Sequence, residues 1–226
     1  MQEKKYFVYD DAEAAYLKAK DPALGRAMDE IGHVYRVVNP DIFMALINAI
    51  IGQQISTKAQ ETVWARFLDS FSPVTPASIA ACSPEQLQGC GISMRKALYI
   101  HEIATSVLEG SLDLDSLQAM PDEQVCQRLS QIKGIGVWTA EMLMIFSMQR
   151  KDVLSWGDMA ILRGMRMLYR HKTITPQLFA KYKRRYAPYG SIASLYLWQI
   201  SHGVCQGLYD PAAKIARKEK RAAPTK

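Results

Sequence analysis

The sequence is most informative between Leu129 and Ala140, which reads LSQIKGIGVWTA. Apolar residues recur at helical spacing on both sides of the Gly134-Ile135-Gly136 turn. Glycine adopts positive φ angles and allows a close approach of the backbone to another group. We therefore predict a helix that runs to about Ile132, a tight turn, and a second helix from Val137, which together form a helix-hairpin-helix.

The hairpin turn is a candidate anion site. Backbone amides near Gly134, Gly136 and Thr139 lie at the start of the second helix, where unpaired N–H groups and the helix dipole favour a negative charge. The competing interpretation is a plain corner between two helices, in which the glycines serve only the turn. The Gly-x-Gly pattern alone favours that plainer interpretation.

Asp158 is a lone acid that follows the hairpin. It precedes a segment with apolar residues at Ile161, Met165 and Leu168, so it is well placed to cap a helix. A carboxylate at a helix N-terminus stays ionised, as an electrostatic stabiliser or a weak general base must. Capping and catalysis are compatible, and the sequence leaves both interpretations open.

The charge distribution is more informative than the net charge of +6. Residues 214–226 carry six basic residues and one acid, so the rest of the chain is close to neutral. The segment between Asp158 and Asp210 contains no other acid. Such a one-signed segment is either a solvated face or a surface for phosphates. Its basic residues are Arg163, Arg166, Arg170, Lys172, Lys181, Lys183, Arg184 and Arg185.

Composition narrows the protein class. With 226 residues, 49% of them hydrophobic, the chain can bury a core as one domain or two small lobes. It contains no apolar run of the roughly 20 residues that span a membrane, and its start does not lead into a signal-peptide core. We therefore expect an intracellular, cytoplasmic protein. The four scattered cysteines favour reduced thiols over zinc or disulfides.

Helix-start signals occur along the whole chain. Thr75-Pro76 and Thr175-Pro176 combine a capping residue with a proline in the first turn. Capping boxes are predicted at Thr57–Gln60 and Ser83–Gln86, and Ser191 is a candidate cap for the last helix. Only the segment Tyr6-Phe7-Val8-Tyr9 has the character of a strand. The sequence therefore predicts an all-α fold, with a basic tail at 214–226 that we expect to be disordered.

Three further stretches carry a family resemblance, and they occur in a fixed order with the hairpin and Asp158. The sequence AIIGQQIS begins at Ala49, GISMRKA begins at Gly91, and YAPYGS begins at Tyr186 and leads to Trp198. This combination resembles the helix-hairpin-helix (HhH-GPD) DNA glycosylase superfamily, and it is most similar to the 3-methyladenine DNA glycosylase II branch. The resemblance covers about residues 21–203. It implies a two-lobed helical fold with the active-site cleft between the lobes.

The resemblance also implies a role for individual residues. Asp158 matches the catalytic aspartate, because Ile161 and Arg163 follow it at the family's spacing. Aromatic residues line the base pocket in this family, and a loop enters the duplex where a nucleotide has left. The matching residues are Trp138 and Trp198 for the base pocket, Gly134, Gly136 and Thr139 for DNA phosphate, and Gln53, Gln54 and Ile55 for the duplex wedge. Without the resemblance, core packing would be the simpler role for both tryptophans.

The implied chemistry is hydrolysis of the N-glycosidic bond of alkylated purines in base excision repair. Alkylation makes a purine cationic, and two aromatic faces would select such a base after it is flipped out of the duplex. The base leaves neutral, so one carboxylate that stabilises the oxocarbenium-like sugar suffices. Bifunctional relatives carry a Schiff-base lysine where this chain has Trp138. We therefore expect no lyase activity.

The resemblance further implies double-stranded DNA as the partner, and we expect a monomer. A monovalent cation, Na⁺ or K⁺, is expected at the backbone carbonyls of Ser130, Ile132 and Gly134. The sequence lacks the four-cysteine loop of iron–sulfur relatives, so neither a cluster nor zinc is expected. Two alternatives stay open: a glycosylase for oxidised or deaminated purines, and a DNA-binding protein that keeps the hairpin without the chemistry.

We expect one lobe at about residues 40–150, with the hairpin at 125–148. The second lobe would combine residues 1–39 with 151–213, and the tail at 214–226 would follow it. Asp158 would lie at the mouth of the cleft between the lobes. The whole chain would then form a single catalytic unit.

Overall fold

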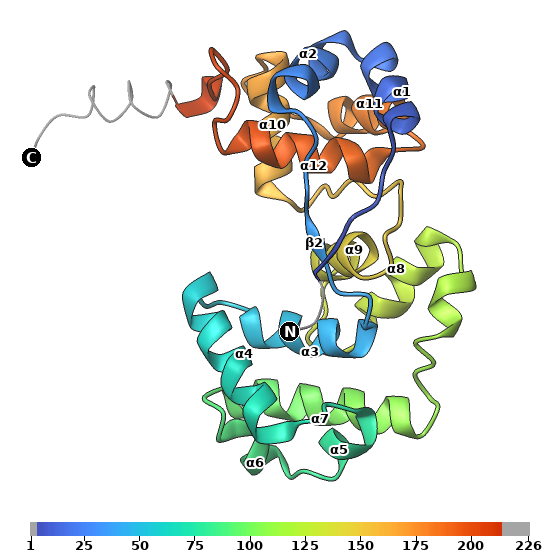
Figure 1. Ribbon diagram of the computed structural model, residues 1–226, viewed down its shortest axis with the longest axis vertical. Coiled ribbons are helices and arrows are strands. Elements are labelled where there is room, and N and C mark those ends of the chain that lie inside the picture. Colours follow the sequence, from blue (N-terminus) through green and yellow to red (C-terminus); the bar gives the residue numbers. More distant parts are fainter. Residues whose placement is uncertain (1–3, 214–226) are drawn as a thin grey trace, which may run out of the picture. The chain divides into compact units, whose positions relative to one another are not determined.

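The computed structural model describes residues 4–213 and divides into two compact units. The central unit is Val38–Gln149, and the terminal unit combines the described residues up to Val37 with those from Arg150 onward. Figure 1 follows the chain from blue to red through both units. The predicted basic tail at 214–226 lies outside the described residues.

Helices make up nearly all of the regular structure in residues 4–213. The short strands β1 and β2 form a two-stranded sheet, so the strand predicted at Tyr6–Tyr9 is reduced to Lys5–Tyr6. The all-α helix-hairpin-helix fold predicted from the sequence is confirmed. The terminal unit contains β1 (Lys5–Tyr6), α1 (Asp11–Lys20), α2 (Pro22–Ile31), α10 (Met159–Tyr169), α11 (Pro176–Tyr186) and α12 (Gly190–Ser201), and β2 (Val37–Val38) joins the units.

The central unit is built around α3 and α7. Helix α3 packs against α4, α7 and α9, and α7 is also covered by the short helices α5 and α6 (Figure 1). Six residues of α3 are buried, and they recur at helical spacing along its length. The elements of this unit are α3 (Ile42–Gly52), α4 (Thr57–Phe71), α5 (Pro76–Ala80), α6 (Pro84–Gln88), α7 (Met94–Leu108), η1 (Ser116–Ala119), α8 (Asp122–Ser130) and α9 (Val137–Phe146).

The core of the terminal unit is α12, ten of whose twelve residues are buried. Helix α10 packs along it, and this contact depends on Gly164. A Cβ at Gly164 would collide with the backbone carbonyl oxygen of Leu197. The absence of a side chain therefore lets the two helices approach closely, which places the start of α10 beside Trp198.

The segment that leads into α10 is anchored to the start of α12. The hydroxyl of Ser191 donates to the Arg150 carbonyl and accepts from the Val153 amide at 2.9 Å. The Gly190 amide donates to the Asp152 carboxylate at 2.9 Å. These bonds satisfy buried polar groups and fix the backbone before Asp158.

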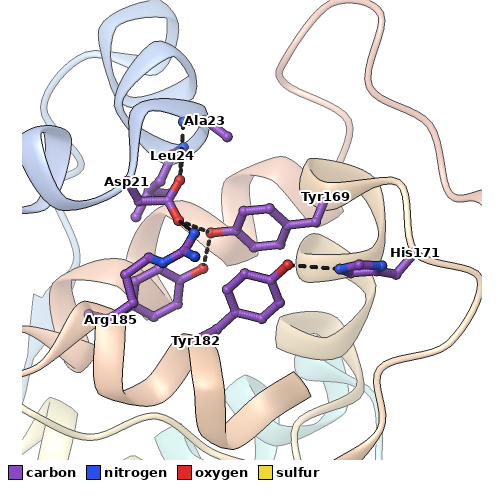
Figure 2. A network of polar contacts seen from close by, with 8 residues as sticks. Asp21, Ala23, Leu24, Tyr169, His171, Tyr182 and Arg185 are labelled. Carbon is purple, nitrogen blue, oxygen red and sulfur yellow. Dashed lines mark hydrogen bonds and ion pairs between the residues drawn. The ribbon is translucent and has the colours of Figure 1, made fainter. Parts of the chain in front are cut away.

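A buried polar cluster joins the N-terminal helices to α10 and α11. Asp21, only 1% exposed, caps α2 by accepting from the Ala23 and Leu24 amides. Its second oxygen accepts from Tyr169 at 2.7 Å and from Arg185 at 2.8 Å. Figure 2 shows these groups converging on the carboxylate. Burial raises the pKa of Tyr169, so this hydroxyl keeps its proton at neutral pH.

Most of the predicted helix starts are confirmed. Thr75, Ser83 and Thr175 cap α5, α6 and α11, and each is followed by a proline at the first helical position. Two predictions are wrong. Ser56 rather than Thr57 caps α4, because the chain becomes helical one residue earlier. Ser191 lies inside α12, where its hydroxyl bonds to the segment before α10 instead of capping the helix.

The described residues contain no helix that is both long enough and apolar enough to cross a membrane. The longest helices, α4 and α7, each have 15 residues. A membrane span needs about 20 apolar residues.

Candidate active site

Asp158 is the N-cap of α10, as the sequence predicted, and it is 7% exposed. One carboxylate oxygen, Oδ1, accepts from the Ala160 amide at 2.8 Å and from the Ile161 amide at 2.9 Å. Both donors belong to the first turn of the helix, where the dipole is positive. The helix therefore orients the carboxylate and stabilises its negative charge.

The other oxygen of Asp158 accepts a hydrogen bond from Trp198. The indole N–H of Trp198 lies 3.1 Å from Oδ2, and this residue comes from α12. The sequence suggested only a base-pocket role for Trp198, because a contact across 40 residues depends on how α10 packs against α12. Trp198 is thus in direct contact with the predicted catalytic carboxylate.

Two exposed apolar residues flank Asp158 in the sequence. Trp156 is 43% exposed and packs edge-to-face against Phe179, with ring centroids 5.1 Å apart. Met159 is 70% exposed at the first position of α10. Large apolar side chains are usually buried, so their exposure beside a buried acid marks a surface that can contact a ligand. The sequence could have identified Trp156 and Met159 as candidate ligand contacts, because both are large apolar residues close to Asp158.

The helix-hairpin-helix lies in the central unit. Helix α8 ends at Ser130 and α9 begins at Val137, close to the predicted boundaries. Gly134 has a φ of +86°, and Gly136 is the N-cap of α9. A glycine cap has no side chain to occupy the amides of the first turn, which are the groups predicted to bind phosphate.

Gly134 is required by packing as well as by its backbone angle. A Cβ at this position would lie 2.6 Å from the Tyr99 ring of α7. At Gly136, by contrast, a Cβ would meet nothing within 4 Å. The open space at Gly136 leaves room for a ligand to approach the backbone of the turn. Thr139 is the third residue of α9, within its first turn, and is partly exposed.

The predicted wedge residues follow α3 in the central unit. Gln54 and Ile55 are exposed, and Gln54 has a φ of +57°. A left-handed backbone costs a residue other than glycine about 1 to 2 kcal/mol, so the surrounding contacts must hold it. Gln53 is partly buried, and its side-chain amide donates to the Gly134 carbonyl at 2.6 Å. This bond gives Gln53 a partner inside the protein that the sequence did not suggest.

The structure groups the predicted residues within each unit. Asp158 and Trp198 meet in the terminal unit, whereas Gln53 and the hairpin turn meet in the central unit. Trp138 is the second residue of α9 and is 49% exposed. An exposed tryptophan at this position is available to a ligand, so the simpler role of core packing does not describe it.

The basic segment after Asp158 has two kinds of member. Arg166 is bound by Asp210, and Arg185 is bound by Asp21. The hydrogen bond from Arg166 holds the pKa of Asp210 below its ordinary value. These two arginines support the fold, and Arg163, although exposed, also pairs with Asp210 at 3.8 Å. The other exposed members of the segment are the candidates for facing phosphate. The exposed members are Arg163, Arg170, Lys172, Lys181, Lys183 and Arg184.

Comparison with known proteins identifies the class and then the family. The helical fold, with its glycine-rich hairpin and its capped acid, is that of a helix-hairpin-helix DNA glycosylase. Residues 47–188 match the family described as HhH-GPD superfamily base excision DNA repair protein. The chain therefore belongs to the HhH-GPD superfamily, and the family and enzyme class predicted from the sequence are confirmed.

Individual relatives agree with this assignment. DNA-3-methyladenine glycosylase 1 of Schizosaccharomyces pombe is 35% identical over 161 residues, covering 69% of this chain and 71% of the relative. A crystal structure of DNA-3-methyladenine glycosidase from Bacillus halodurans has a TM-score of 0.81 at 32% identity, covering 94% and 99%. The S. pombe 3-methyladenine DNA glycosylase Mag1, solved in complex with abasic DNA, has a TM-score of 0.71 at 32% identity, covering 83% and 95%.

Proposed function

We propose that this protein is a monofunctional DNA glycosylase that hydrolyses the N-glycosidic bond of alkylated purines in double-stranded DNA. The observation that carries the proposal is the Asp158 carboxylate, held by two helix amides and the Trp198 indole. The names of the relatives, 3-methyladenine glycosylases and an abasic-DNA complex, support the substrate class and the partner. We further propose that the protein acts as a monomer inside the cell.

The proposed reaction begins with a cationic purine that has been flipped out of the duplex. The bond between the sugar C1′ and the purine nitrogen breaks, and its electron pair goes to the nitrogen, so the base leaves neutral. The sugar is left with oxocarbenium character, which the negative charge of Asp158 stabilises. A water molecule then adds to C1′ and releases a proton to the solvent, which leaves an abasic site and the Asp158 carboxylate unchanged.

In this proposal the remaining site residues bind the DNA and select the damaged base. The first-turn amides of α9, around Gly136 and Thr139, bind a backbone phosphate. The faces of Trp138 and Trp198 attract a positively charged base more strongly than a neutral one. Gln54 and Ile55 enter the duplex and fill the space that the flipped nucleotide leaves.

The proposed cation at the hairpin must share its ligands. The Gly134 carbonyl already accepts from Gln53, and the Ile132 carbonyl accepts from the Ile135 amide at 2.9 Å. A carbonyl oxygen has two lone pairs, so both groups retain one for Na⁺ or K⁺ together with the Ser130 carbonyl. The bound ion would add a positive charge near the phosphate. Weaker binding of abasic duplex DNA when K⁺ and Na⁺ are replaced by tetramethylammonium would support this site.

The test of the function is release of free base from methylated duplex DNA by the wild-type protein. We expect release of methylpurines, an abasic product and an uncut strand. Trapping of a covalent DNA adduct with borohydride would contradict the monofunctional mechanism. Release of oxidised or deaminated bases instead of methylpurines would change the substrate class, and DNA binding without any base release would favour a non-catalytic binding protein.

A further inference from the structure

The motif that begins at Gly91 contains Lys96, whose ammonium group binds the end of α3. Its Nζ donates to the Ile51 carbonyl at 2.9 Å and to the Gln53 carbonyl at 2.7 Å. The last carbonyls of a helix lack partners within the helix, and a cation is the favoured group at that end. Lys96 therefore caps the C-terminus of α3, and the wedge residues follow directly after this helix.

Gln53 extends this contact to the hairpin. Its backbone carbonyl accepts from Lys96, and its side-chain amide donates to the Gly134 carbonyl at 2.6 Å. The first bond joins residues that are 43 positions apart in the sequence, and the second joins residues that are 81 positions apart. One residue therefore joins the wedge, the hairpin turn and α7.

The same face of α7 also contacts the hairpin directly. Lys96, Tyr99 and Glu102 follow one another at intervals of three residues, which places them along one side of a helix. The Tyr99 ring fills the space in front of Gly134, and Glu102 pairs with Lys133 at 2.8 Å. The Lys133–Glu102 pair is exposed and contributes little energy, so Lys96 and Tyr99 are the main contacts.

The wedge loop, Gln54–Ser56, is anchored at both of its ends. Gln53 precedes it and is held as described, and Ser56 caps α4 by accepting from the Ala59 amide. Between these anchors, Gln54 keeps its left-handed backbone and Ile55 is 40% exposed. A strained conformation of this kind persists only when its surroundings hold it in place.

We propose that Lys96 and Gln53 are positioning residues that fix the wedge loop to the phosphate-binding hairpin. This inference rests on the proposed function. The phosphate-binding start of α9 and the apolar wedge side chain contact the same rigid duplex. The distance between these two parts of the protein must therefore match a fixed distance in the DNA. The Lys96–Gln53–Gly134 contacts set that separation within the central unit before DNA arrives, so no ordering is needed at the moment of base flipping.

The first experiment tests directly whether the Lys96–Gln53–Gly134 contacts hold the wedge loop, and it does not depend on enzymatic activity. Lys96→Met keeps the length and the apolar stem of the side chain but removes the donors. Arg95→Met is the matched control, because it removes the same charge from the neighbouring, exposed position of α7. We expect amide hydrogen exchange of residues 53–56 to become at least tenfold faster in Lys96→Met and Gln53→Leu, and to be unchanged in Arg95→Met. Equal exchange in all proteins would overturn the proposal.

The second experiment compares base release from methylated duplex and single-stranded DNA. In Lys96→Met and Gln53→Leu we expect release from duplex to fall about tenfold. Release from single strands should stay within about twofold, because no wedge is needed there. The slope of duplex affinity against salt should also be unchanged, because the phosphate contacts are retained. A matching loss on single strands would indicate general damage and contradict a positioning role.

A double-variant cycle shows whether Lys96 acts through the wedge. If it does, adding Lys96→Met to Ile55→Ala causes little further loss of duplex activity, since the wedge has already been removed. Multiplicative losses would overturn the proposal. If the wild type releases no methylpurine at all, the proposed function fails. The same cycle, read by binding to duplex DNA with a tetrahydrofuran abasic analogue, then decides the positioning role by itself.

Discussion

Asp21 and Asp158 occupy the same kind of position in the terminal unit, but their second oxygens meet different partners. Each is buried, each caps a helix, and each accepts from two first-turn amides through Oδ1. The Oδ2 of Asp21 accepts from a guanidinium and a phenol, whereas the Oδ2 of Asp158 accepts from the neutral indole of Trp198. The helix cap is thus shared, and the partner of the other oxygen differs.

We expect the two aspartates to have different roles, Asp21 in the fold and Asp158 in the proposed reaction. The charge of Asp21 is compensated by Arg185, and Figure 2 shows the carboxylate enclosed by its donors. A donor without net charge, such as the Trp198 indole, orients a carboxylate without neutralising it. Its negative charge then acts on a cationic transition state in a site of low dielectric. The proposed catalytic role of Asp158 therefore depends on the Trp198 contact to orient the carboxylate.

The largest effect is expected for Asp158→Asn. Asparagine still caps the helix, so the free energy of unfolding should fall by only about 1 kcal/mol. The negative charge is lost, and base release should fall on the order of 10²- to 10³-fold. Single-turnover release of methylpurine from duplex DNA, with binding of abasic duplex as the control, measures this. Unchanged release would make Asp158 a helix cap with the same purely structural role as Asp21.

The converse pattern is expected for Asp21→Asn. The amide group of asparagine would face the donors of Arg185 and Tyr169, so the ion pair and one hydrogen bond are lost. Because Arg185 is one-third exposed, the loss of stability should lie near the lower end for buried pairs, at about 3 kcal/mol. Urea unfolding measures it. Base release per folded molecule, assayed well below the unfolding temperature, should stay within about twofold, and a large loss there would contradict the comparison.

The two aspartates also show what the sequence can predict. A helix cap is local, because Asp158 and the amides that it accepts from lie within four residues, so the sequence was sufficient to predict it. The same holds for the hairpin, whose turn needs glycine at Gly134. The Trp198 and Gln53 contacts were not predictable, because they join residues 40 and 81 positions apart. Such contacts depend on helix packing, for example on the space that Gly164 leaves between α10 and α12.

The substitution Trp198→Phe tests the role of the indole N–H. Phenylalanine keeps an aromatic face but cannot donate to Asp158, so the carboxylate loses one of its orienting contacts. We expect kcat to fall about tenfold, the equivalent of one hydrogen bond. The affinity for abasic duplex should change little. Trp64→Phe is the control, since Trp64 lies in α4 of the central unit and stacks on Phe67.

Two further results would separate orientation from base stacking at Trp198. If orientation of Asp158 is the main role, Trp198→Phe lowers release of a cationic methylpurine and of a neutral base by the same factor. A loss confined to the cationic base would assign Trp198 to cation–π selection instead. An equal loss in Trp64→Phe would show that the effect is a general consequence of exchanging tryptophan for phenylalanine and not of the lost hydrogen bond to Asp158.

The smallest effect concerns a third aspartate, Asp210, which pairs with Arg166 as Asp21 pairs with Arg185, but which caps neither α2 nor α10. Arg166 binds it through two nitrogens, at 2.9 and 2.6 Å, and this hydrogen bonding lowers the pKa of Asp210. A lowered pKa contributes stability above the ordinary value of the carboxyl group, and that contribution is lost as the pH falls through the lowered value. Asp210→Asn should therefore cost about 1.5 kcal/mol at pH 7.

The difference between wild type and Asp210→Asn should then begin to shrink below about pH 4, where the carboxyl group takes up a proton in the unfolded chain. It should be lost once the pH has fallen through the lowered pKa of the folded protein. Urea unfolding at a series of pH values, from 7 down to 3, measures it. A difference that stays constant over this range would mean that the charge of Asp210 is not what stabilises the contact. The Asp210–Arg166 contact would then act as a hydrogen bond that does not need the negative charge. Of the two aspartate–arginine pairs, only Asp21–Arg185 would then have an electrostatic role.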